Sequence, residues 1–195
     1  MSLFCGLELE TSPGLVMTPR PATEALVDAA VERAGDRAAR IADVGTGSGA
    51  IAIALASRLP RAEIWASDVS RHAVDLARAN AARHGFADRI HMAQGDLLDP
   101  IPSPVCLVVA NLPYLPDDLH DHSRYAEYAA EPAEAVFAAE NGLALYRRLL
   151  SAAEKRLDAE GALVIQFRRE ILEAERHQLA ELRERIEDAA FLVAA

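Results

Sequence analysis

Short apolar runs alternate along the chain, from Arg40 onward, with longer segments whose apolar residues recur every three or four positions. The runs that read as strands are Arg40 to Val44, Glu63 to Ser67, Arg89 to Ala93, Val105 to Ala110, Ala162 to Phe167 and the final segment 188–195. Strands separated by helices are joined by crossover connections, which make neighbouring strands parallel. The alternation therefore predicts an α/β fold, in which a doubly wound and mostly parallel sheet is flanked by helices.

The segments between these runs have the amphipathic pattern of helices. The expected helices are 49–59, 70–85, 142–161 and 168–187. Residues 1–39 form a lead-in with one more helix, which begins at a cap supplied by Thr18 or Thr23. With 195 residues, 51% of them hydrophobic, the chain has room for one core. We therefore expect a single domain, in which the lead-in precedes a core of residues 40–195.

Acidic residues outnumber basic ones by 30 to 20, and the formal net charge is −10. This charge disfavours loose attraction to nucleic acid or to an anionic membrane surface. No apolar run approaches the roughly 20 residues of a membrane helix, and the two cysteines lie far apart. We expect a cytoplasmic protein with no membrane partner. The segment 117–122, DDLHDH, is interpreted as a solvated acidic loop, and no metal site is expected.

The sequence DVGTGSGAIAIALA, residues 43–56, ends a strand, turns on glycines and opens a helix. Gly45, Gly47 and Ala50 satisfy the G-x-G-x-x-G/A pattern of dinucleotide-binding loops, and Gly49 lies in the same turn. The pattern alone also occurs in turns that bind nothing. Its position between a strand and a helix predicts a Rossmann-like site for a nucleotide-like ligand.

Three aspartates stand at the ends of three successive strands, on the edge where open α/β sheets bind ligands. Asp68 lies 19 residues after Gly49, where a carboxylate can accept hydrogen bonds from both ribose hydroxyls. Asp96 can accept from an adenine amine while Leu97 packs on the ring. Asp43, beside the glycine loop, suits an ammonium group better than a pyrophosphate. S-adenosylmethionine has an amino group and no phosphate, so these residues favour it over a nicotinamide cofactor.

The fourth strand ends at Asn111, and Leu112, Pro113 and Tyr114 follow it. In isolation these residues read as ordinary turn formers. Beside a cofactor methyl group, the Asn111 side chain and the Leu112 carbonyl can accept both protons of a planar amide or aromatic amine. Pro113 would stiffen the loop, and Tyr114 would stack on the planar group. Catalysis would then consist mostly of orientation for in-line methyl transfer.

Together the motifs resemble those of class I S-adenosylmethionine-dependent methyltransferases, and specifically the release-factor glutamine N5-methyltransferase family. The matching stretches are 19–24 (PRPATE), 43–56, 67–70 (SDVS), 95–96 (GD), 111–116 (NLPYLP) and 131–150 (EPAEAVFAAENGLALYRRLL). The resemblance implies a cofactor site formed by Thr23, Asp43, Gly45, Gly47, Gly49, Asp68, Asp96, Leu97 and Asn111. It also implies that Asn111, Pro113 and Tyr114 hold the amide of a glutamine in a protein such as a release factor.

Some features depart from that family. It usually reads Asn-Pro-Pro-Tyr, whereas Leu112 is also typical of the ribosomal-RNA adenine dimethyltransferases. We expect no counterpart of the family's helical amino-terminal domain, and an open sheet edge after the sixth strand that a partner can cover. The alternative acceptor is an adenine or guanine of RNA or DNA, which the acidic segment 115–122 disfavours. Small-molecule methylation and a non-catalytic module that binds the cofactor or a partner are further alternatives.

Overall fold

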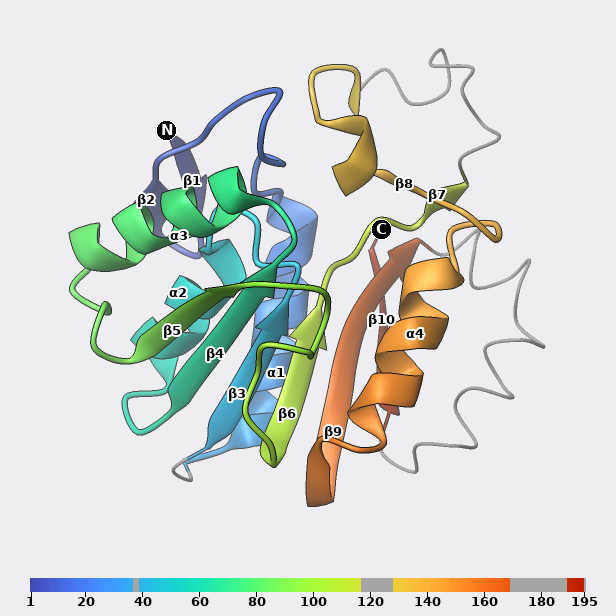
Figure 1. Cartoon of the computed structure of the whole chain (residues 1–195). Coiled ribbons are helices and arrows are strands. Elements are labelled where there is room, and N and C mark those ends of the chain that lie inside the picture. Colours follow the sequence, from blue (N-terminus) through green and yellow to red (C-terminus); the bar gives the residue numbers. More distant parts are fainter. Residues whose placement is uncertain (37–38, 117–127, 169–188, 195) are drawn as a thin grey trace.

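The computed structural model describes residues 1–36, 39–116, 128–168 and 189–194, which form a six-stranded parallel sheet and its flanking helices (Figure 1). In spatial order the strands are β10 (Ala189–Ala194), β9 (Leu157–Arg168), β6 (Val105–Ala110), β3 (Arg40–Val44), β4 (Glu63–Asp68) and β5 (Ile90–Gln94). Every neighbouring pair is parallel. The predicted α/β sheet is confirmed, and the strands that carry the glycine loop and Asn111 lie side by side at its centre.

Helices cover both faces of the sheet (Figure 1). They are α1 (Glu24–Ala34), α2 (Ala50–Arg58), α3 (Arg71–Arg83) and α4 (Ala144–Ala153). Side chains alternate along a strand, so Leu107 and Val109 of β6 belong to one core with α1 and α2, whereas Val108 and Ala110 belong to another with α4. Burial of these two apolar cores supplies the main driving force for folding.

The strand β9 begins earlier than the sequence pattern predicts. A continuous helix is expected over 142–161, but α4 ends at Ala153 and β9 starts at Leu157. The cause is pairing with β6, because the Val105 N–H donates to the Arg156 carbonyl (2.8 Å) and Val105 stands opposite Leu157. Sheet hydrogen bonds with a distant strand thus override the helical pattern at the end of this segment.

The other predicted strands agree with the structure to within one residue at each end. Of the helix expected over 168–187, only Arg168 lies among the described residues, and it ends β9. Within the described part of the chain, no helix combines the length and the apolar character that crossing a bilayer requires.

The lead-in contains a hairpin that the sequence pattern does not predict. Its strands β1 (Ser2–Phe4) and β2 (Leu7–Leu9) bury Phe4 and Leu9 in the same core as α1 and α2. Thr23 occupies the N-cap position of α1, as predicted, but its side chain makes no capping hydrogen bond. The Thr23 hydroxyl instead accepts a hydrogen bond from Asn111 and so joins the start of α1 to the end of β6.

Candidate active site

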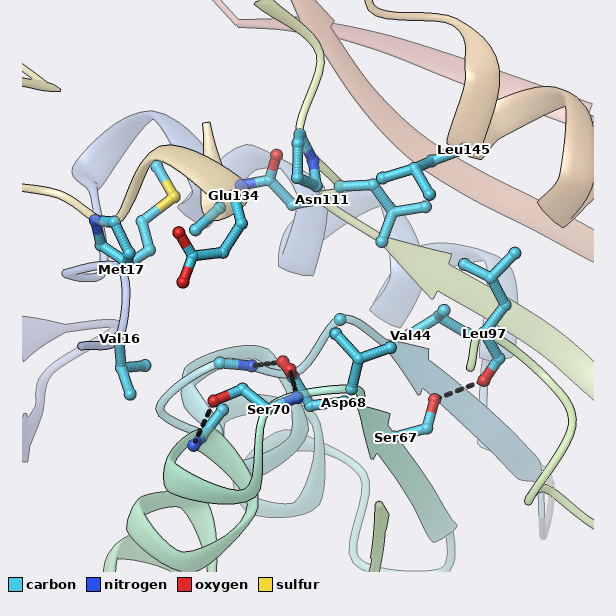
Figure 2. A pocket seen from close by; sticks show the side chains of 18 of the residues that line it. Val16, Met17, Val44, Ser67, Asp68, Ser70, Leu97, Asn111, Glu134 and Leu145 are labelled. Atoms are coloured by element: carbon cyan, nitrogen blue, oxygen red, sulfur yellow. Dashed lines mark hydrogen bonds between the residues drawn. The ribbon is translucent and has the colours of Figure 1, made fainter. Parts of the chain in front are cut away.

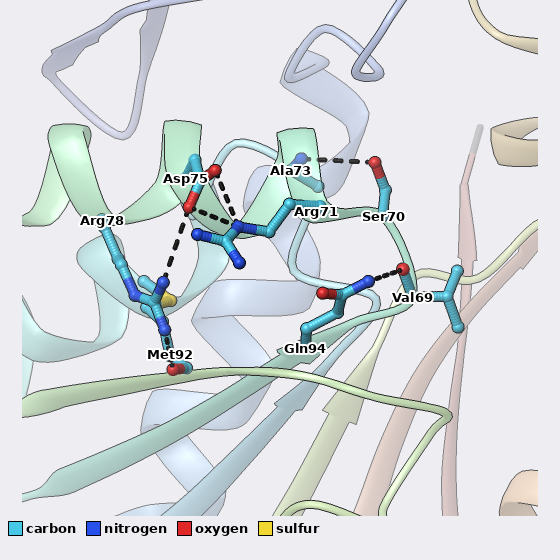
Figure 3. Close-up of polar contacts among 8 residues, drawn as sticks. All are labelled: Val69, Ser70, Arg71, Ala73, Asp75, Arg78, Met92 and Gln94. Atoms are coloured by element: carbon cyan, nitrogen blue, oxygen red, sulfur yellow. Dashed lines mark hydrogen bonds and ion pairs between the residues drawn. The ribbon is translucent and has the colours of Figure 1, made fainter.

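The predicted site residues converge on a cavity at the carboxyl ends of β3, β4 and β6 (Figure 2). Those that line it are Gly45, Gly47, Asp68, Asp96, Leu97, Asn111 and Pro113. The predicted residues that do not line it are Thr23, Asp43, Gly49 and Tyr114. Parallel strands bring their carboxyl ends to one edge of the sheet, which is why motifs far apart in the sequence meet there.

The glycine loop between β3 and α2 requires glycine for two different reasons. At Gly45 the backbone has a φ of 74°, and a Cβ would lie 2.7 Å from Cδ2 of Leu112. At Gly49, just before α2, a Cβ would lie 3.0 Å from the Cβ of Ala77 in α3. Gly45 therefore lets this loop touch the loop that follows β6, and Gly49 lets α2 pack closely on α3.

Asp68, at the end of β4, faces the cavity (Figure 2). Its Oδ2 accepts a hydrogen bond from the Gly47 N–H and its Oδ1 accepts one from the Ser70 N–H, both at 2.9 Å. Burial raises the pKa of this carboxyl, and the backbone donors oppose the rise. A carboxylate oxygen has room for a second donor. Asp68 is thus held rigidly and can still accept hydrogen bonds from ligand hydroxyls.

Asp43 lies beneath the glycine loop and has no exposed surface. Its Oδ2 accepts hydrogen bonds from the Thr46 hydroxyl (2.6 Å) and from the Ala52 N–H at the start of α2 (3.1 Å). Burial raises the pKa of Asp43 to about 7, although these hydrogen bonds lower it. Its Oδ1 is buried and has no hydrogen-bond partner among the described residues. Asp43 therefore fastens the loop to α2 and leaves one buried oxygen that a bridging water could satisfy.

Asp96 and Leu97 follow β5 and form another part of the cavity wall. Leu97 has a φ of 45°, and its carbonyl accepts a hydrogen bond from the Ser67 hydroxyl (2.6 Å), which ties this wall to β4 (Figure 2). Asp96 forms an ion pair with Arg148 of α4. The sequence pattern places Arg148 on a solvated helix face, and its pairing with a residue 52 positions away has no local signal.

Asn111 lies where three cavities meet. It lines the main cavity, a small cavity beside Tyr114 and Tyr128, and a third between the glycine loop and Thr23. Its side-chain nitrogen donates to Oγ1 of Thr23 (3.2 Å). This bond fixes the orientation of the amide and leaves the Asn111 Oδ1 to accept hydrogen bonds. Met17 lines the same three cavities, although no motif marks it in the sequence.

Glu131 joins the lead-in to the segment that precedes β8 (Phe137–Ala138). Its Oε2 accepts a hydrogen bond from the Thr18 N–H (2.9 Å), and its Oε1 lies 3.6 Å from Nη2 of Arg20. The Arg20 guanidinium lies over the Tyr128 ring, 4.1 Å from its centroid. We call these four residues the latch. Thr18, Arg20 and Glu131 lie within or directly beside the stretches 19–24 and 131–150. Nothing in those stretches indicates that these side chains contact one another.

Two predictions from the sequence remain predictions. Among the described residues, no three His, Cys, Asp or Glu side chains come together to hold a metal ion, but segment 117–122 lies outside those residues. β10 is an edge strand whose only strand partner in the described part of the chain is β9. A protein partner at that edge is therefore still an expectation.

The sequence model of the family described as methyltransferase small domain matches residues 18–139. The chain belongs to this family. The match includes the glycine loop, the three aspartates and Asn111. Most of the residues that line the main cavity therefore lie in the matched part of the chain; Leu15, Val16, Met17 and Leu145 lie outside it.

Curated relatives with similar sequences are named release factor glutamine methyltransferases. The one from Gloeobacter violaceus is 38% identical over 170 residues, which cover 82% of this chain and 56% of the relative. The one from Escherichia coli K12 is 37% identical over 164 residues, which cover 84% of this chain and 58% of the relative. This chain thus spans little more than half the length of the relatives that it matches.

Solved structures support the fold assignment for this family member. A ribosomal protein L11 methylase from Lactobacillus delbrueckii subsp. bulgaricus has a TM-score of 0.61 at 23% identity and covers 88% of this chain, or 71% of its own. A precorrin-6y C5,15-methyltransferase from Geobacter metallireducens has a TM-score of 0.60 at 13% identity, with coverages of 90% and 77%. At such identities the likeness shows the fold alone, which is the Rossmann-like fold of class I methyltransferases.

Proposed function

We propose that this member of the methyltransferase small domain family transfers a methyl group from S-adenosylmethionine to the side-chain amide nitrogen of a protein glutamine. The observation that carries the proposal is the position of Asn111. Its amide oxygen is left to accept hydrogen bonds at the junction of the main cavity and the small cavity beside Tyr114. The names of the curated relatives support the same reaction.

The wall of the main cavity suits a cationic ligand. Three carboxylates line it, from Asp68, Asp96 and Glu134, and the wall contains no Lys or Arg among the described residues. Glu134 points into the cavity from the 3-10 helix Ala133–Ala135 (Figure 2). S-adenosylmethionine carries a sulfonium, an ammonium and a carboxylate but no phosphate, so its net positive charge complements this wall. The pyrophosphate of a nicotinamide cofactor would be repelled.

Several residues would hold this cofactor. Asp68 would accept hydrogen bonds from the ribose hydroxyls, and Leu97 would supply an apolar surface for the adenine. Gly45 and Gly47 would allow the backbone to approach the ligand closely. Asp43 would act mainly by fastening the glycine loop, with its Oδ1 available to a bridging water. Bound S-adenosylmethionine would supply the electrophilic methyl group.

The acceptor amide would be held by two oxygens. The Asn111 Oδ1 and the Leu112 carbonyl would accept its two N–H protons, which fixes the plane of the amide. Pro113 lines both the main and the small cavity, and Tyr114 lines the small one, where it would lie against the planar group. The amide lone pair is delocalised, so the rate would depend on orientation for in-line attack. The nitrogen would lose one proton to solvent after the methyl group is transferred.

A release factor with an exposed glutamine is the acceptor that we propose, in the cytoplasm. In this view residues 40–195 form the methyltransferase core, and the lead-in, residues 1–39, contributes Thr23 and part of the latch. Leu112 favours a second acceptor class, an adenine or guanine of RNA or DNA. The net charge of −10 opposes it, since a nucleic-acid site needs local basic groups.

The test is transfer of a labelled methyl group from S-adenosylmethionine into a release factor and into a methyl-poor cell lysate, afterwards separated into protein, RNA, DNA and small molecules. The wild-type chain is compared with Asn111→Ala, which removes the acceptor oxygen. Glu140→Gln is the matched control, because its side chain is 62% exposed and pairs with Arg147 on the surface.

We expect label on a protein glutamine that disappears with Asn111→Ala and persists with Glu140→Gln. Label in RNA or DNA would overturn the choice of acceptor. Bound cofactor without any label would overturn the proposed activity. Cofactor binding is measured separately by calorimetry, so that a variant that fails to bind is not mistaken for one that fails to react.

A further inference from the structure

The hydroxyl of Tyr146 touches the backbone of Leu112 twice. Tyr146 is a fully buried residue of α4, on the opposite face of the sheet from α1 and α2. Its oxygen accepts a hydrogen bond from the Leu112 N–H (3.0 Å) and lies 2.9 Å from the Leu112 carbonyl oxygen. It also lies 2.9 Å from the carbonyl oxygen of Gln166 in β9. One side chain from a distant helix therefore holds the peptide groups on both sides of Leu112.

The hydroxyl has one hydrogen and two carbonyl acceptors within reach, so it donates to either Leu112 or Gln166 at any moment. Burial raises the pKa of the Tyr146 hydroxyl well above its usual value, so the hydrogen is retained across the neutral range. The Leu112 N–H is satisfied in both arrangements. The Leu112 carbonyl has two lone pairs, so the one that does not face Tyr146 is available to another donor in either arrangement.

The surroundings hold this side chain in one place. The Tyr146 ring packs on the Phe167 ring, with centroids 4.1 Å apart. Four residues before it, a Cβ at Gly142 would lie 2.0 Å from the carbonyl oxygen of Tyr114, so the chain just before α4 also lies directly against the loop. Tyr146 and Gly142 thus contact the loop that follows β6 at two points, Leu112 and Tyr114.

We propose that Tyr146 is a positioning residue for methyl transfer, which directs the Leu112 carbonyl toward the acceptor amide. The inference rests on the proposed function, because it concerns how that reaction's acceptor is held. Tyr146 is not among the residues that line the cavities around Asn111, so it acts through Leu112 and touches neither the cofactor nor the acceptor. When the acceptor binds, one lone pair of the Leu112 carbonyl faces Tyr146 and the other receives the amide hydrogen.

The test is Tyr146→Phe, which keeps the ring and its packing on Phe167 and removes only the hydroxyl. We expect kcat for glutamine methylation of a release factor to fall about 10- to 100-fold, because a displacement of the order of 1 Å is costly in an orientation-limited reaction. The dissociation constant of S-adenosylmethionine should change by less than about twofold, since Tyr146 itself lines no part of the main cavity. Hydrogen exchange at the Leu112 amide should become faster because the buried N–H loses its acceptor.

The matched control is Leu149→Val, at a fully buried position of the same helix. It removes core volume but no hydrogen bond to the loop, so it should lower the melting temperature while kcat stays within about twofold of wild type. A second variant, Phe167→Leu, loosens the ring packing and retains the hydroxyl. It should lower kcat less than Tyr146→Phe and leave cofactor affinity unchanged, and it serves as the test if Tyr146→Phe does not fold.

Failure of this inference and failure of the proposed function give different results. If the wild-type chain binds S-adenosylmethionine but methylates no glutamine, the proposed function is wrong and this inference falls with it. If wild type is active and Tyr146→Phe behaves like Leu149→Val, with a lower melting temperature and an unchanged kcat, only the positioning role is overturned. A loss of kcat in Tyr146→Phe together with an equal loss of cofactor affinity also overturns it.

Discussion

The glycine loop and the loop that follows β6 form two sides of one site, yet they are held by contacts of very different range. In the glycine loop, Asp43 accepts hydrogen bonds from groups three and nine residues away. In the other loop, Asn111 is bonded to a hydroxyl 88 residues away, and Leu112 to one 34 residues away. The glycine loop is thus fastened to α2 by its own sequence, and β4 and α3 also hold its backbone from 21 to 32 residues away. The loop after β6 depends on contacts of longer range, 34 and 88 residues away.

This difference has an energetic consequence. Contacts close in sequence need little loop closure, whereas distant contacts form only after the intervening chain has been ordered. We therefore expect changes in the glycine loop to act locally on cofactor binding. Changes in distant segments should instead alter how the acceptor is held.

The largest expected effect comes from Gly45→Ala, which breaks the contact between the two loops. The new methyl group would meet Cδ2 of Leu112 at 2.7 Å in a backbone conformation that disfavours side chains. The Leu112 side chain would have to move, so methyl transfer should fall about 10- to 100-fold and cofactor affinity should fall with it, as measured by turnover and calorimetry. The control is Gly85→Ala, which has nearly the same φ (75°) but nothing within 4 Å of its Cβ. Equal losses in the two variants would contradict the proposed steric contact.

The second prediction concerns pH and belongs to the glycine loop alone. The pKa of Asp43 is about 7 in the folded chain and near 3.8 without burial, so between these values the folded state binds a proton that the unfolded state releases. The contribution of Asp43 to the free energy of unfolding should therefore be largest below about pH 4 and fall toward pH 7, by at most about 1.4 kcal/mol per pH unit. Urea unfolding at several pH values measures it. Asp43→Asn should reduce this slope and Asn111→Ala should keep it; the same slope in both variants would mean that another group is responsible.

Glu131→Gln, a change in the latch, should have a smaller effect and on the acceptor side only. The amide oxygen can still accept the Thr18 N–H, but the charge that faces Arg20 is lost from a side chain only 8% exposed. We expect KM for the acceptor to rise about three- to tenfold and the cofactor dissociation constant to stay the same. Steady-state kinetics with each substrate varied separates the two. Glu140→Gln is again the control, and an equal change in both constants would mean that the latch does not act on one side alone.

Arg148→Ala should have the smallest effect, although Arg148 pairs with Asp96 on the cavity wall. Both side chains are well exposed, 55% and 43%, and exposed ion pairs contribute less than about 1 kcal/mol. Cofactor affinity should change by about twofold at low salt and less at high salt, because added ions screen the pair. A tenfold change would show that Asp96 is positioned by Arg148.

The same difference in range explains which parts of the fold and site the sequence could predict. The sequence predicts the strands around the glycine loop and the positions of Asp68 and Asp96 at strand ends. Each of these features is indicated by an apolar run or a motif that is complete within a few residues. The start of β9 is not indicated in this way, because it depends on pairing with Val105 some fifty residues earlier. The hairpin in the lead-in also gives a weak signal, since its strands are only three residues long.

The sequence gives least information about residues that contact the site from a segment far away in the chain. In the sequence Tyr146 reads as one more apolar position of an amphipathic helix, and its hydroxyl acquires a role only when α4 lies against the loop after β6. Glu131 reads as one acid among many, until the fold places it beside Thr18 and Arg20. Apolar periodicity and residue propensity indicate which helix or strand a residue belongs to. They carry little information about the residues that it contacts in a different helix or strand.

The order of the strands divides the sheet into two halves that come from successive parts of the chain. The chain enters the sheet at its centre with β3, builds outward through β4 and β5, and then returns to the centre to build the other half from β6. Residues up to 97 form one wall of the cavity, and most of the opposite wall comes from β6 onward. A chimaera joined between β5 and β6 would therefore inherit the glycine loop, Asp68 and Asp96 from one parent, and Asn111 and Glu134 from the other.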